Sequence, residues 1–425
     1  MLQKHPVTAP NPPRRRRRRL LAAAAAGVAL VLATPQAASA DPFFPDNNDD
    51  YPVYSSDPHL TICGRYENPY RPKLCLYASV DDGTGSDANY PMRFTKLWTI
   101  DTNKDWRRPS NWTYEGVVAS EDMLGLNGRH FWAPAGYWDF TSNYLYVPDV
   151  VNGDNNTGSR IFVFKAPAAE GEYELVGQIN TPTSGANAPN GGYASDPFVA
   201  LDYNGTPYLF YANGTYDSTI CGGISRARLA SNLTSIPYPP QYYVARITFK
   251  GLQDDLGTCR GRDAYIEGPA VYNKYQLYDV AGRWPRSFAG IDNHEWIMMF
   301  SVKPSTTPKM TNPNAQDEDG EAAVTCNGSN QQALAYATAQ NLTDTEWTYR
   351  GIIMCPRGAE WTNHGSLIRY RFDSVILAFH DGPANGHRRK VMLDCLTWDP
   401  DGRLRTVPVS RYNAANCSNW GPSWN

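Results

Sequence analysis

Three carboxylates in this 425-residue sequence stand in similar short motifs and could carry acid–base chemistry. Asp57 and Asp196 each lie in a Ser-Asp-Pro tripeptide, and Glu267 directly precedes a Gly-Pro pair. Carboxyl groups that converge in a cleft have their pKa values pushed apart, so that one holds a proton while another is charged. Glycoside hydrolysis needs such a set, because one group protonates the leaving oxygen while another acts on the opposite face of the sugar.

Each motif also has a purely structural interpretation. Asp-Pro is a common turn starter, and either Ser-Asp-Pro tripeptide alone favours a turn. Glu267 is harder to explain, since the stretch YIEGPAVY around it is otherwise apolar or turn-forming, and burying a lone carboxylate is costly unless it is paired or protonated. Apolar surroundings and a nearby charge on Asp196 would raise its pKa and keep it protonated, as a general acid requires. We therefore interpret the three carboxylates as one catalytic set.

Two series of short segments must position these carboxylates. Five runs dense in aromatic and branched residues predict strands, and they span residues 73–79, 143–149, 207–213, 295–301 and 374–380. Each run follows a segment that carries a polar group beside Pro or Gly. Five units of mostly strand predict an all-β, five-bladed β-propeller whose opening strands line the axis. The side chains expected to converge there are Asp57, His130, Asp196, Glu267 and His364. A two-sheet sandwich with long loops is the rival architecture; it explains the strands but not the paired series.

The start of the chain differs from the rest. Six arginines, Arg14 to Arg19, precede an apolar stretch of 14 residues and a small-residue cleavage site after Ala40. This pattern predicts a signal peptide over 1–40, so we expect the protein to be secreted to the extracellular space. A catalytic propeller is expected over 41–411, followed by a short C-terminal tail over 412–425.

Charge and cysteine content argue against some partners and favour disulfides. Beyond residue 40 the chain has 32 Lys and Arg against 42 Asp and Glu, a net charge near −10, which argues against nucleic acid and anionic membrane surfaces as partners. All eight cysteines lie in this part, and none of their spacings is the Cys-x-x-Cys of a zinc site. Because a hairpin would bring Cys63 and Cys75 together, we predict a disulfide between them.

The motifs together resemble those of glycoside hydrolase family 43 (GH43). SSDPHL, YASDPFVALDYNGTPYLFY, YIEGPAVY and WTNHGSL follow the order and rough spacing of that family's signatures. The stretch NGHRRKVMLDCLTWDPDGRL at 385–404 is similar to its closing blade, and the resemblance covers residues 51–410. It implies an inverting five-bladed propeller enzyme that acts on pentose-containing plant polysaccharides (arabinoxylan, arabinan or xylan), above all as an arabinofuranosidase or xylosidase.

The resemblance also implies roles for individual residues. Asp57 would be the general base and Glu267 the general acid, while Asp196 would orient the acid and raise its pKa. His364 resembles an axial histidine that coordinates calcium in many members, although calcium prefers oxygen ligands and a hydrogen-bonded core histidine is the alternative. Residues 274–293 depart from the simplest family pattern, and we expect this insertion to lie near the acid.

Further residues are candidates for binding substrate. Trp132, in HFWAPAGYW, is expected to wall the sugar site by stacking, with a place in the core as the alternative. His130 opens the same segment. Arg389 is expected to bind a sugar hydroxyl or to pair with a carboxylate. In contrast, His380 is expected to have a packing role and His59 to cap a turn.

Two other functions remain as alternatives. One is a carbohydrate-binding propeller without catalysis, against which the carboxylates argue, because a lectin has no need of a protonated glutamate. The other is a retaining five-bladed hydrolase acting on fructans, whose nucleophile typically follows Asn, whereas residue 56 here is Ser. In every case the expected partner is a polysaccharide or oligosaccharide bound by a monomer. A structural calcium ion is the one cofactor expected.

Overall fold

The computed structural model describes most of the expected propeller region. The described residues are 54–64, 72–81, 92–125, 130–150, 160–181, 194–213, 223–238, 242–252, 266–273, 295–302, 310–311, 325–326, 332–354, 363–370, 374–381, 389–397 and 404. The chain divides into two compact units, Met1–Asp41 and Pro42–Asn425, and every described residue lies in the second. The signal peptide expected over 1–40 and the tail expected over 412–425 lie outside the described residues. Across the described ranges, no helix has the length and apolarity that a membrane span requires.

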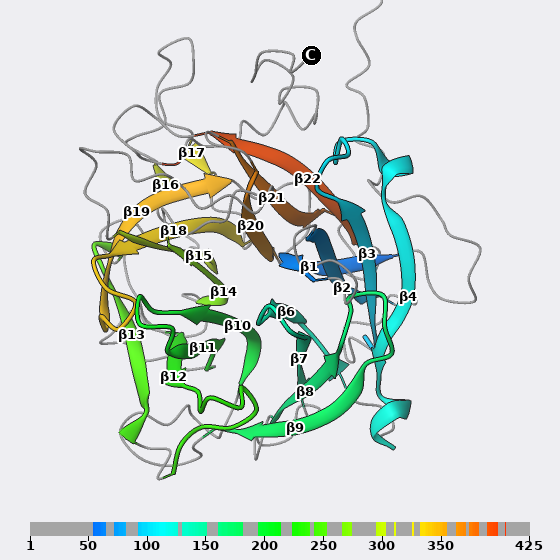
Figure 1. Cartoon of the computed structure of the whole chain (residues 1–425). Helices are drawn as coiled ribbons and strands as arrows, with labels where there is room; N and C mark the ends of the chain where they lie inside the picture. The colour runs from blue at the N-terminus through cyan, green and yellow to red at the C-terminus, as the bar shows by residue number, and fades with distance from the viewer. Residues whose placement is uncertain are drawn as a thin grey trace, which may run out of the picture. The chain divides into compact units, whose positions relative to one another are not determined.

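The strands form five antiparallel blades, here called blades 1 to 5, that follow one another along the chain (Figure 1). Blades 3 and 4 belong to one eight-stranded sheet. Blade 1 contains β1 (Ser55–Cys63), β2 (Lys73–Val80), β3 (Phe94–Asp101) and β4 (Thr113–Ser120). Blade 2 contains β5 (His130–Phe131), β6 (Ala135–Trp138), β7 (Asn143–Val150), β8 (Arg160–Ala166) and β9 (Glu174–Asn180). Both β5 and β6 pair with β7, so they form one interrupted strand.

The other three blades repeat this order. Blade 3 contains β10 (Ser195–Leu201), β11 (Pro207–Ala212), β12 (Ile224–Arg228) and β13 (Val244–Lys250). Blade 4 contains β14 (Ile266–Asn273), β15 (Trp296–Val302), β18 (Ala333–Ala339) and β19 (Glu346–Met354), and a small hairpin of β16 (Met310–Thr311) and β17 (Thr325–Cys326) precedes β18. Blade 5 contains β20 (Gly365–Tyr370), β21 (Ser374–Asp381) and β22 (Lys390–Thr397). Blades 3 and 4 also join at their outer edges, where β13 pairs in parallel with β19.

The five aromatic runs expected to be strands are confirmed as β2, β7, β11, β15 and β21, the second strand of each blade. These strands are flanked on both sides within their blades. β2 and β15 are buried along their whole length, which explains why they are apolar throughout rather than alternating. Helical elements in the described part are limited to two three-residue 3-10 helices, η1 (Pro109–Asn111) and η2 (Asp122–Leu124). The expected low helix content is therefore confirmed.

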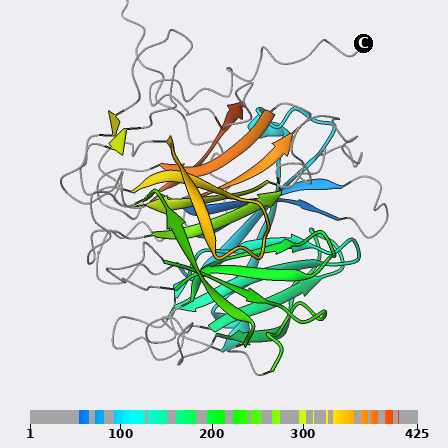
Figure 2. The same cartoon turned by 90° about the vertical axis from the view of Figure 1, so that its left-hand side faces the viewer.

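The first strands of the blades close a ring. In that ring β1 contacts β6, β6 contacts β10, β10 contacts β14, β14 contacts β20, and β20 contacts β1. Figure 1 shows these strands around the centre of the view with the blades radiating from them, and Figure 2 shows the twisted sheets from the side. Two facing sheets would not give this ring, so the propeller is confirmed and the sandwich is not.

The hydrophobic core lies between adjacent blades rather than at the axis. One cluster joins blade 1 to blade 5 through residues such as Leu76 and Ile376. Two further clusters fill the spaces between blades 1 and 2 and between blades 2 and 3. Because apolar side chains fill the gaps between blades, the polar residues of the opening strands are left to line the axis.

The predicted disulfide between Cys63 and Cys75 is confirmed, with Cα atoms 5.8 Å apart. It joins the last residue of β1 to β2, at the opposite end of β1 from the Ser-Asp-Pro motif. The bridge therefore stabilises the hairpin that carries Asp57 and does not take part in the polar cluster described below.

Candidate active site

Each of blades 1, 3 and 4 opens with a β-bulge at one of the three expected motifs. The pairing register skips one residue between Ser56 and His59, between Ser195 and Phe198, and between Glu267 and Ala270. The two residues inside each bulge are an Asp or a Gly and the Pro that follows it. Because Pro has no N–H to give to the ladder, it is suited to a bulge. A bulge redirects the side chains beside it, which is why such features are frequent near active sites.

The bulges correct the expected equivalence of the three carboxylates. Asp57 (φ 50°), Asp196 (φ 50°) and Gly268 (φ 64°) occupy the same position, immediately before Pro, and all three adopt the left-handed backbone. Glycine adopts this conformation without cost, and aspartate tolerates it better than most residues. Glu267 lies one residue earlier, where the other two motifs have serine. The candidate acid therefore comes from a different position of the repeat than the two aspartates.

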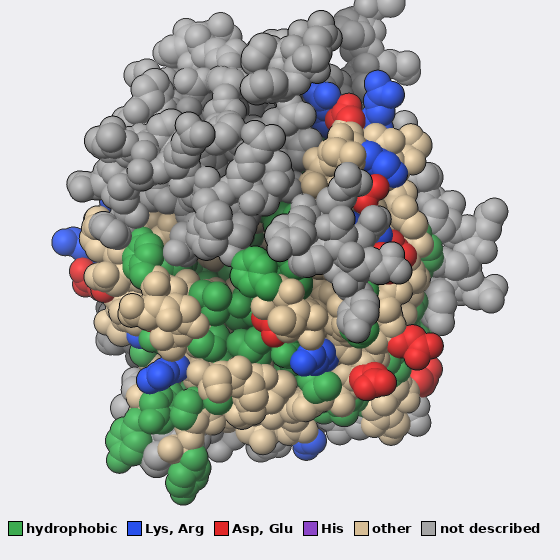
Figure 3. All heavy atoms as spheres, viewed as in Figure 1, with side chains coloured by type: hydrophobic (Ala, Val, Ile, Leu, Met, Phe, Trp, Pro, Cys, Tyr) green, Lys and Arg blue, Asp and Glu red, His purple; other side chains and the backbone are tan. Residues whose placement is uncertain are grey.

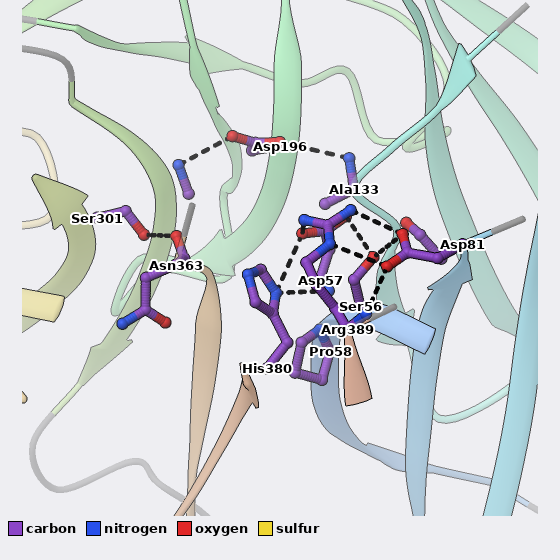
Figure 4. A network of polar contacts seen from close by, with 12 residues as sticks. Ser56, Asp57, Pro58, Asp81, Ala133, Asp196, Ser301, Asn363, His380 and Arg389 are labelled. Atoms are coloured by element: carbon purple, nitrogen blue, oxygen red, sulfur yellow. Dashed lines mark hydrogen bonds and ion pairs between the residues drawn. The ribbon is translucent and has the colours of Figure 1, made fainter. Parts of the chain in front are cut away.

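Asp57 is buried and surrounded by donors and positive charge (Figure 4). Its Oδ1 lies 3.3 Å from Arg389 Nη1, and the hydroxyl of Ser56 donates to its Oδ2 over 3.2 Å. Burial alone would raise the pKa of Asp57. Four groups together outweigh that effect: the charge of Arg389, the neighbouring His380 and His364, and the Ser56 hydrogen bond. The pKa of Asp57 is therefore lowered from its usual value. Asp57 is therefore ionised at neutral pH, as a general base must be.

Arg389, 2% exposed, is shared between two carboxylates. Its Nε and Nη2 donate to Asp81 Oδ2 and Oδ1 over 3.0 and 2.8 Å, and its backbone N donates to Asp81 Oδ2 over 3.0 Å. The remaining Nη1 points to Asp57. Of the two roles expected for Arg389, pairing with a carboxylate is the one seen here. Asp81 follows β2 directly and was missed by sequence reasoning, because SVDDG looks like an ordinary solvated turn.

Asp196 lies between blades 2 and 4 and is held by backbone groups. Ala133 N donates to its Oδ1 over 3.3 Å, and Gly268 N donates to its Oδ2 over 3.0 Å. Burial raises the pKa of Asp196 well above its usual value. The carboxyl groups of Glu267 and Asp57 raise it further, against the two backbone hydrogen bonds. Because one of these bonds comes from the residue after Glu267, Asp196 is tied directly to the backbone that carries the candidate acid.

Glu267 is buried and held by a glutamine. Gln332 Nε2 donates to Glu267 Oε1 over 2.7 Å, and Gln332 Oε1 accepts from Asn363 N over 2.6 Å. Ser301, the partner of Glu267 in the β14–β15 ladder, donates to Asn363 O. Gln332 was also missed, since the segment NQQALAY has no motif that marks it. An amide that uses both its donor and its acceptor holds the carboxyl group in one orientation.

Two further histidines contact the site. Asp57 N donates to His380 Nδ1 over 3.1 Å, and the same nitrogen lies 3.4 Å from Asp57 Oδ1. His380 is buried, as its expected packing role requires, and it also contacts the candidate base. His59 is not a turn cap. Its Nε2 bonds Gly136 O over 3.1 Å, its ring lies 5.2 Å from that of Phe198, and burial together with His364 lowers its pKa to about 3.

His364 is buried beside the bulge of blade 4. A Cβ atom on Gly268 would lie 2.9 Å from His364 Nδ1, so the imidazole rests against that glycine. Burial lowers the pKa of His364, Asp57 acts in the opposite direction, and Arg389 adds to the lowering. The described residues include no group of three or more His, Cys, Asp or Glu arranged to hold a metal ion. Calcium takes six to eight oxygen ligands, so the described side chains do not fit a calcium ion held by several of them. The metal role of His364 stays a prediction.

The two residues expected to bind substrate in blade 2 precede, in sequence, the residue whose N–H contacts Asp196. Trp132 is partly buried and directly precedes Ala133, whose N–H bonds that carboxylate. His130 lies in β5 opposite Val150, two residues before Trp132. Their binding roles stay predictions.

The insertion at 274–293 falls outside the described residues, but its attachment points do not. It leaves β14 at Asn273 and returns just before β15. Asn273 is six residues along the strand from Glu267, about 20 Å in an extended chain. Both ends are therefore attached at the far end of the hairpin from Glu267, and the expectation that the insertion lies near the acid stays a prediction.

These contacts define what the site can do chemically. An ionised carboxylate, Asp57, is held by Arg389, and a second buried pair, Asp196 and Glu267, lies within electrostatic reach of it. Two buried carboxyl groups that interact in this way titrate as a pair, because the charge of one disfavours ionisation of the other. The site therefore presents a base and a proton donor from separate blades. Figure 3, viewed as in Figure 1, shows a hollow in the surface near the ring of opening strands. Hydrophobic side chains surround this hollow.

Comparisons with known proteins identify the fold. No family model matches the sequence, and no curated protein matches it. A GH43 β-xylosidase/α-arabinofuranosidase from a compost microbial metagenome, solved with xylotriose in a calcium-free form, matches with a TM-score of 0.55 and 20% identity, covering 86% of this chain and 96% of that chain. The GH43_1 enzyme from Xanthomonas citri, complexed with xylotriose, matches with a TM-score of 0.55 and 18% identity over 88% and 94%. The Cellvibrio cellulosa α-L-arabinanase, complexed with arabinohexaose, gives 0.50 and 14% over 84% and 96%.

At these identities the similarity concerns the fold. The chain has the all-β propeller fold of GH43 structures over most of its length, as its motifs predict.

Proposed function

We propose that this protein is a glycoside hydrolase that cleaves pentose-containing plant polysaccharides with inversion of configuration. The observation that carries the proposal is the buried set of three carboxyl groups at the axis, one ionised beside Arg389 and two coupled to each other. Burying three acids is costly, and a lectin has no use for the coupled pair. The GH43 fold supports a glycosidase over a binding module, although a fold alone does not decide function.

In the proposed reaction Asp57 is the general base and Glu267 the general acid. Asp57 removes a proton from a water molecule, whose oxygen attacks the anomeric carbon. The bond from that carbon to the leaving oxygen breaks, and Glu267 gives its proton to that oxygen. The products are a free sugar of inverted configuration and a shortened glycan. Asp57 then releases its proton to solvent, and Glu267 takes one up.

Asp196 decides where the shared proton of the coupled pair lies. Its two oxygens each accept a backbone N–H, and such bonds favour the charged form of a carboxyl group. Glu267 Oε1 accepts from the side chain of Gln332, a neutral amide. We therefore place the charge on Asp196 and the proton on Glu267. In this arrangement Asp196 keeps Glu267 protonated and orients it through Gly268.

The substrate class is proposed from the neighbouring folds and the surroundings of the site. Two of the similar structures hold xylotriose and one holds arabinohexaose. Trp132 would stack on an apolar face of the sugar, with His130 beside it. Arg389 would act on the substrate through Asp57 rather than by direct contact, since its guanidinium is buried against carboxylates. An arabinofuranosidase or xylosidase activity fits these features.

Secretion belongs to the same proposal. The arginine-led apolar segment of 1–40 fits an exported protein, and polysaccharide substrates lie outside the cell.

The test is hydrolysis of arabinoxylan, arabinan and xylo-oligosaccharides by the mature chain, with the released sugars identified. NMR of the first-formed anomer reports whether configuration inverts. Release of arabinose or xylose with inversion is the expected result. Retention would contradict the role of Asp57 as a base. Binding of the polysaccharides without release of any sugar would favour a carbohydrate-binding propeller instead.

A further inference from the structure

The charge of Arg389 is divided unequally between two buried carboxylates. Asp81 accepts both prongs of the guanidinium fork and the backbone N–H, over 2.8 to 3.0 Å. Asp57 receives only Nη1, over 3.3 Å. An arginine that faces a single carboxylate forms the two-bonded pair with it. Here Asp81 forms the two-bonded pair. It is 2% exposed and directly follows β2, the strand next to β1.

The hydroxyl of Ser56 lies between the same two carboxylates. Its oxygen is 3.2 Å from Asp57 Oδ2 and 3.1 Å from Asp81 Oδ1. A hydroxyl has one proton to donate, so the two carboxylates compete for it. The Sδ of Met92 completes the group, lying 3.1 Å from Arg389 Nη2 and 3.4 Å from the Ser56 oxygen. The thioether is a weak acceptor without charge, so it adds no negative charge to the group.

We propose that Asp81 and Ser56 are positioning residues that set the strength of the base, by holding Arg389 so that only part of its charge reaches Asp57. The proposal rests on the proposed function, in which Asp57 activates water. Neither residue touches the reacting atoms, so both act through Asp57.

The physical reason is a compromise that every carboxylate base faces. Asp57 must be ionised, which needs positive charge nearby, because it is buried. A full two-bonded pair with arginine would ionise it but make it a poor proton acceptor, since the affinity for a proton falls with the pKa. Asp81 binds Nε and Nη2 of Arg389, so Asp57 keeps a single contact with this guanidinium, through Nη1. Ser56 adds a hydrogen bond that can move between the two acceptors.

Other charged or titratable groups also face Asp57 and contribute to the same balance. They are His380 from β21, His364 before β20, Asp196 from β10 and Arg389 before β22. Asp81 differs from these because it contacts both Arg389 and Ser56, and these two residues contact different oxygens of the Asp57 carboxylate.

The test uses two substitutions that are expected to move the same quantity in opposite directions. In Asp81→Asn the guanidinium loses the negative charge of Asp81, so more of its charge acts on Asp57, and the acid limb of the pH profile of kcat/KM should move down by about one pH unit. The plateau of kcat should fall several-fold with it. In Ser56→Ala the carboxylate of Asp57 loses a hydrogen-bond donor, so the acid limb of the same profile should move up by roughly a few tenths of a pH unit. Loss of packing alone would not move the limb in opposite directions.

Ser195→Ala is the matched control. Ser195 occupies the same position of the bulge in blade 3, is equally buried, and its hydroxyl has no hydrogen-bond partner within the described ranges. In Ser195→Ala the acid limb of the pH profile of kcat/KM should stay at the wild-type position. If Asp81→Asn does not fold, the Ser56→Ala and Ser195→Ala pair carries the test. A Ser56→Ala limb that is unmoved or lower overturns the proposal, as does an Asp81→Asn limb that is unmoved or higher.

A second readout does not depend on hydrolysis. ¹³C NMR of carboxyl-labelled aspartate, with the Asp57 signal assigned by its loss in Asp57→Asn, reports the titration of Asp57 directly. The midpoint should move down in Asp81→Asn and up in Ser56→Ala. If no tested glycan is cleaved but the midpoints move as expected, the proposed function fails while Asp81 and Ser56 still tune Asp57. If glycans are cleaved and the midpoints stay fixed, the positioning roles are overturned and the function stands.

Discussion

At the scale of single residues, Glu267 and Asp57 differ in what they must do to a substrate, and this difference can be measured. Glu267→Gln should reduce kcat/KM on polysaccharide by about 100-fold or more, because the leaving oxygen then goes unprotonated. On a nitrophenyl glycoside, whose leaving group needs little protonation, the loss should be much smaller. Asp57→Asn should impair both substrates alike, since each needs an activated water. Equal losses for Glu267→Gln on the two substrates would remove Glu267 from the acid role.

The coupled carboxyl pair also predicts how stability depends on pH. Burial and the neighbouring Glu267 raise the pKa of Asp196 in the folded protein, so the Asp196–Glu267 pair keeps a proton that both groups release in the unfolded chain. Stability from this source is therefore present at low pH and is lost as pH rises through the folded pKa. Glu267→Gln keeps an acceptor for Gln332 but removes the second carboxyl group, which together with burial raises the pKa of Asp196. The variant should lose less stability than the wild type as pH rises above the ordinary carboxyl pKa of about 4.

Thermal unfolding at several pH values checks this expectation. The melting temperature of Glu267→Gln should rise relative to the wild type as pH increases, by an amount equivalent to about 1 kcal/mol or more over the range. Parallel curves for the two proteins would show that the carboxyl groups are not coupled.

At the scale of elements, the bulge is the device that positions the site, and its left-handed residue is a point of vulnerability. In Gly268→Ala the new Cβ would meet His364 Nδ1 at 2.9 Å, and the backbone at φ 64° would also be strained. Gly205 is the matched control, since it has φ 76° but nothing within 4 Å of a Cβ atom. Gly205→Ala should cost about 1–2 kcal/mol of unfolding free energy from strain alone.

Gly268→Ala should cost more than Gly205→Ala, and it alone should reduce activity. The reason is that the shift of His364 or of the bulge also disturbs the hydrogen bond from Gly268 N to Asp196. Denaturant unfolding and kcat/KM measured on both variants check this. Equal costs with full activity in both would mean that the packing of His364 against this glycine is unimportant.

At the scale of the whole molecule, the ring is closed by polar contacts between its first and last blades. Ser366 of β20 accepts from Leu60 N over 2.7 Å and donates to Pro58 O over 3.0 Å. Ser366→Ala leaves two buried backbone groups of β1 without this partner, so it should lower the unfolding free energy by about 1–3 kcal/mol. Ser195→Ala, which removes a buried hydroxyl that is not part of this closure, should change it by less than about 0.5 kcal/mol. A similar small effect for both would place the closure of the ring in its apolar contacts alone.

The sequence by itself determined the repeat and most of the site. Apolar, aromatic runs mark strands that are buried on both faces, and a polar residue beside Pro or Gly marks the segment that opens a blade. Both signals depend on local chemistry, so they are visible without a structure. The family resemblance added the roles of Asp57, Asp196 and Glu267, and the hairpin spacing indicated the Cys63–Cys75 bridge.

Only the tertiary structure decided which partners those carboxylates have. Asp81 and Arg389 are 308 residues apart, and Asp57 and His380 are 323 apart, because closing the ring brings the last blade against the first. Gln332 reaches Glu267 from 65 residues away. No local pattern encodes such pairs: an Asp in a turn or a Gln before a strand looks the same whether it faces solvent or a buried acid. Burial and charge at the axis come from five blades meeting there, so the lowered pKa of Asp57 and the raised pKa of Asp196 are properties of the folded ring.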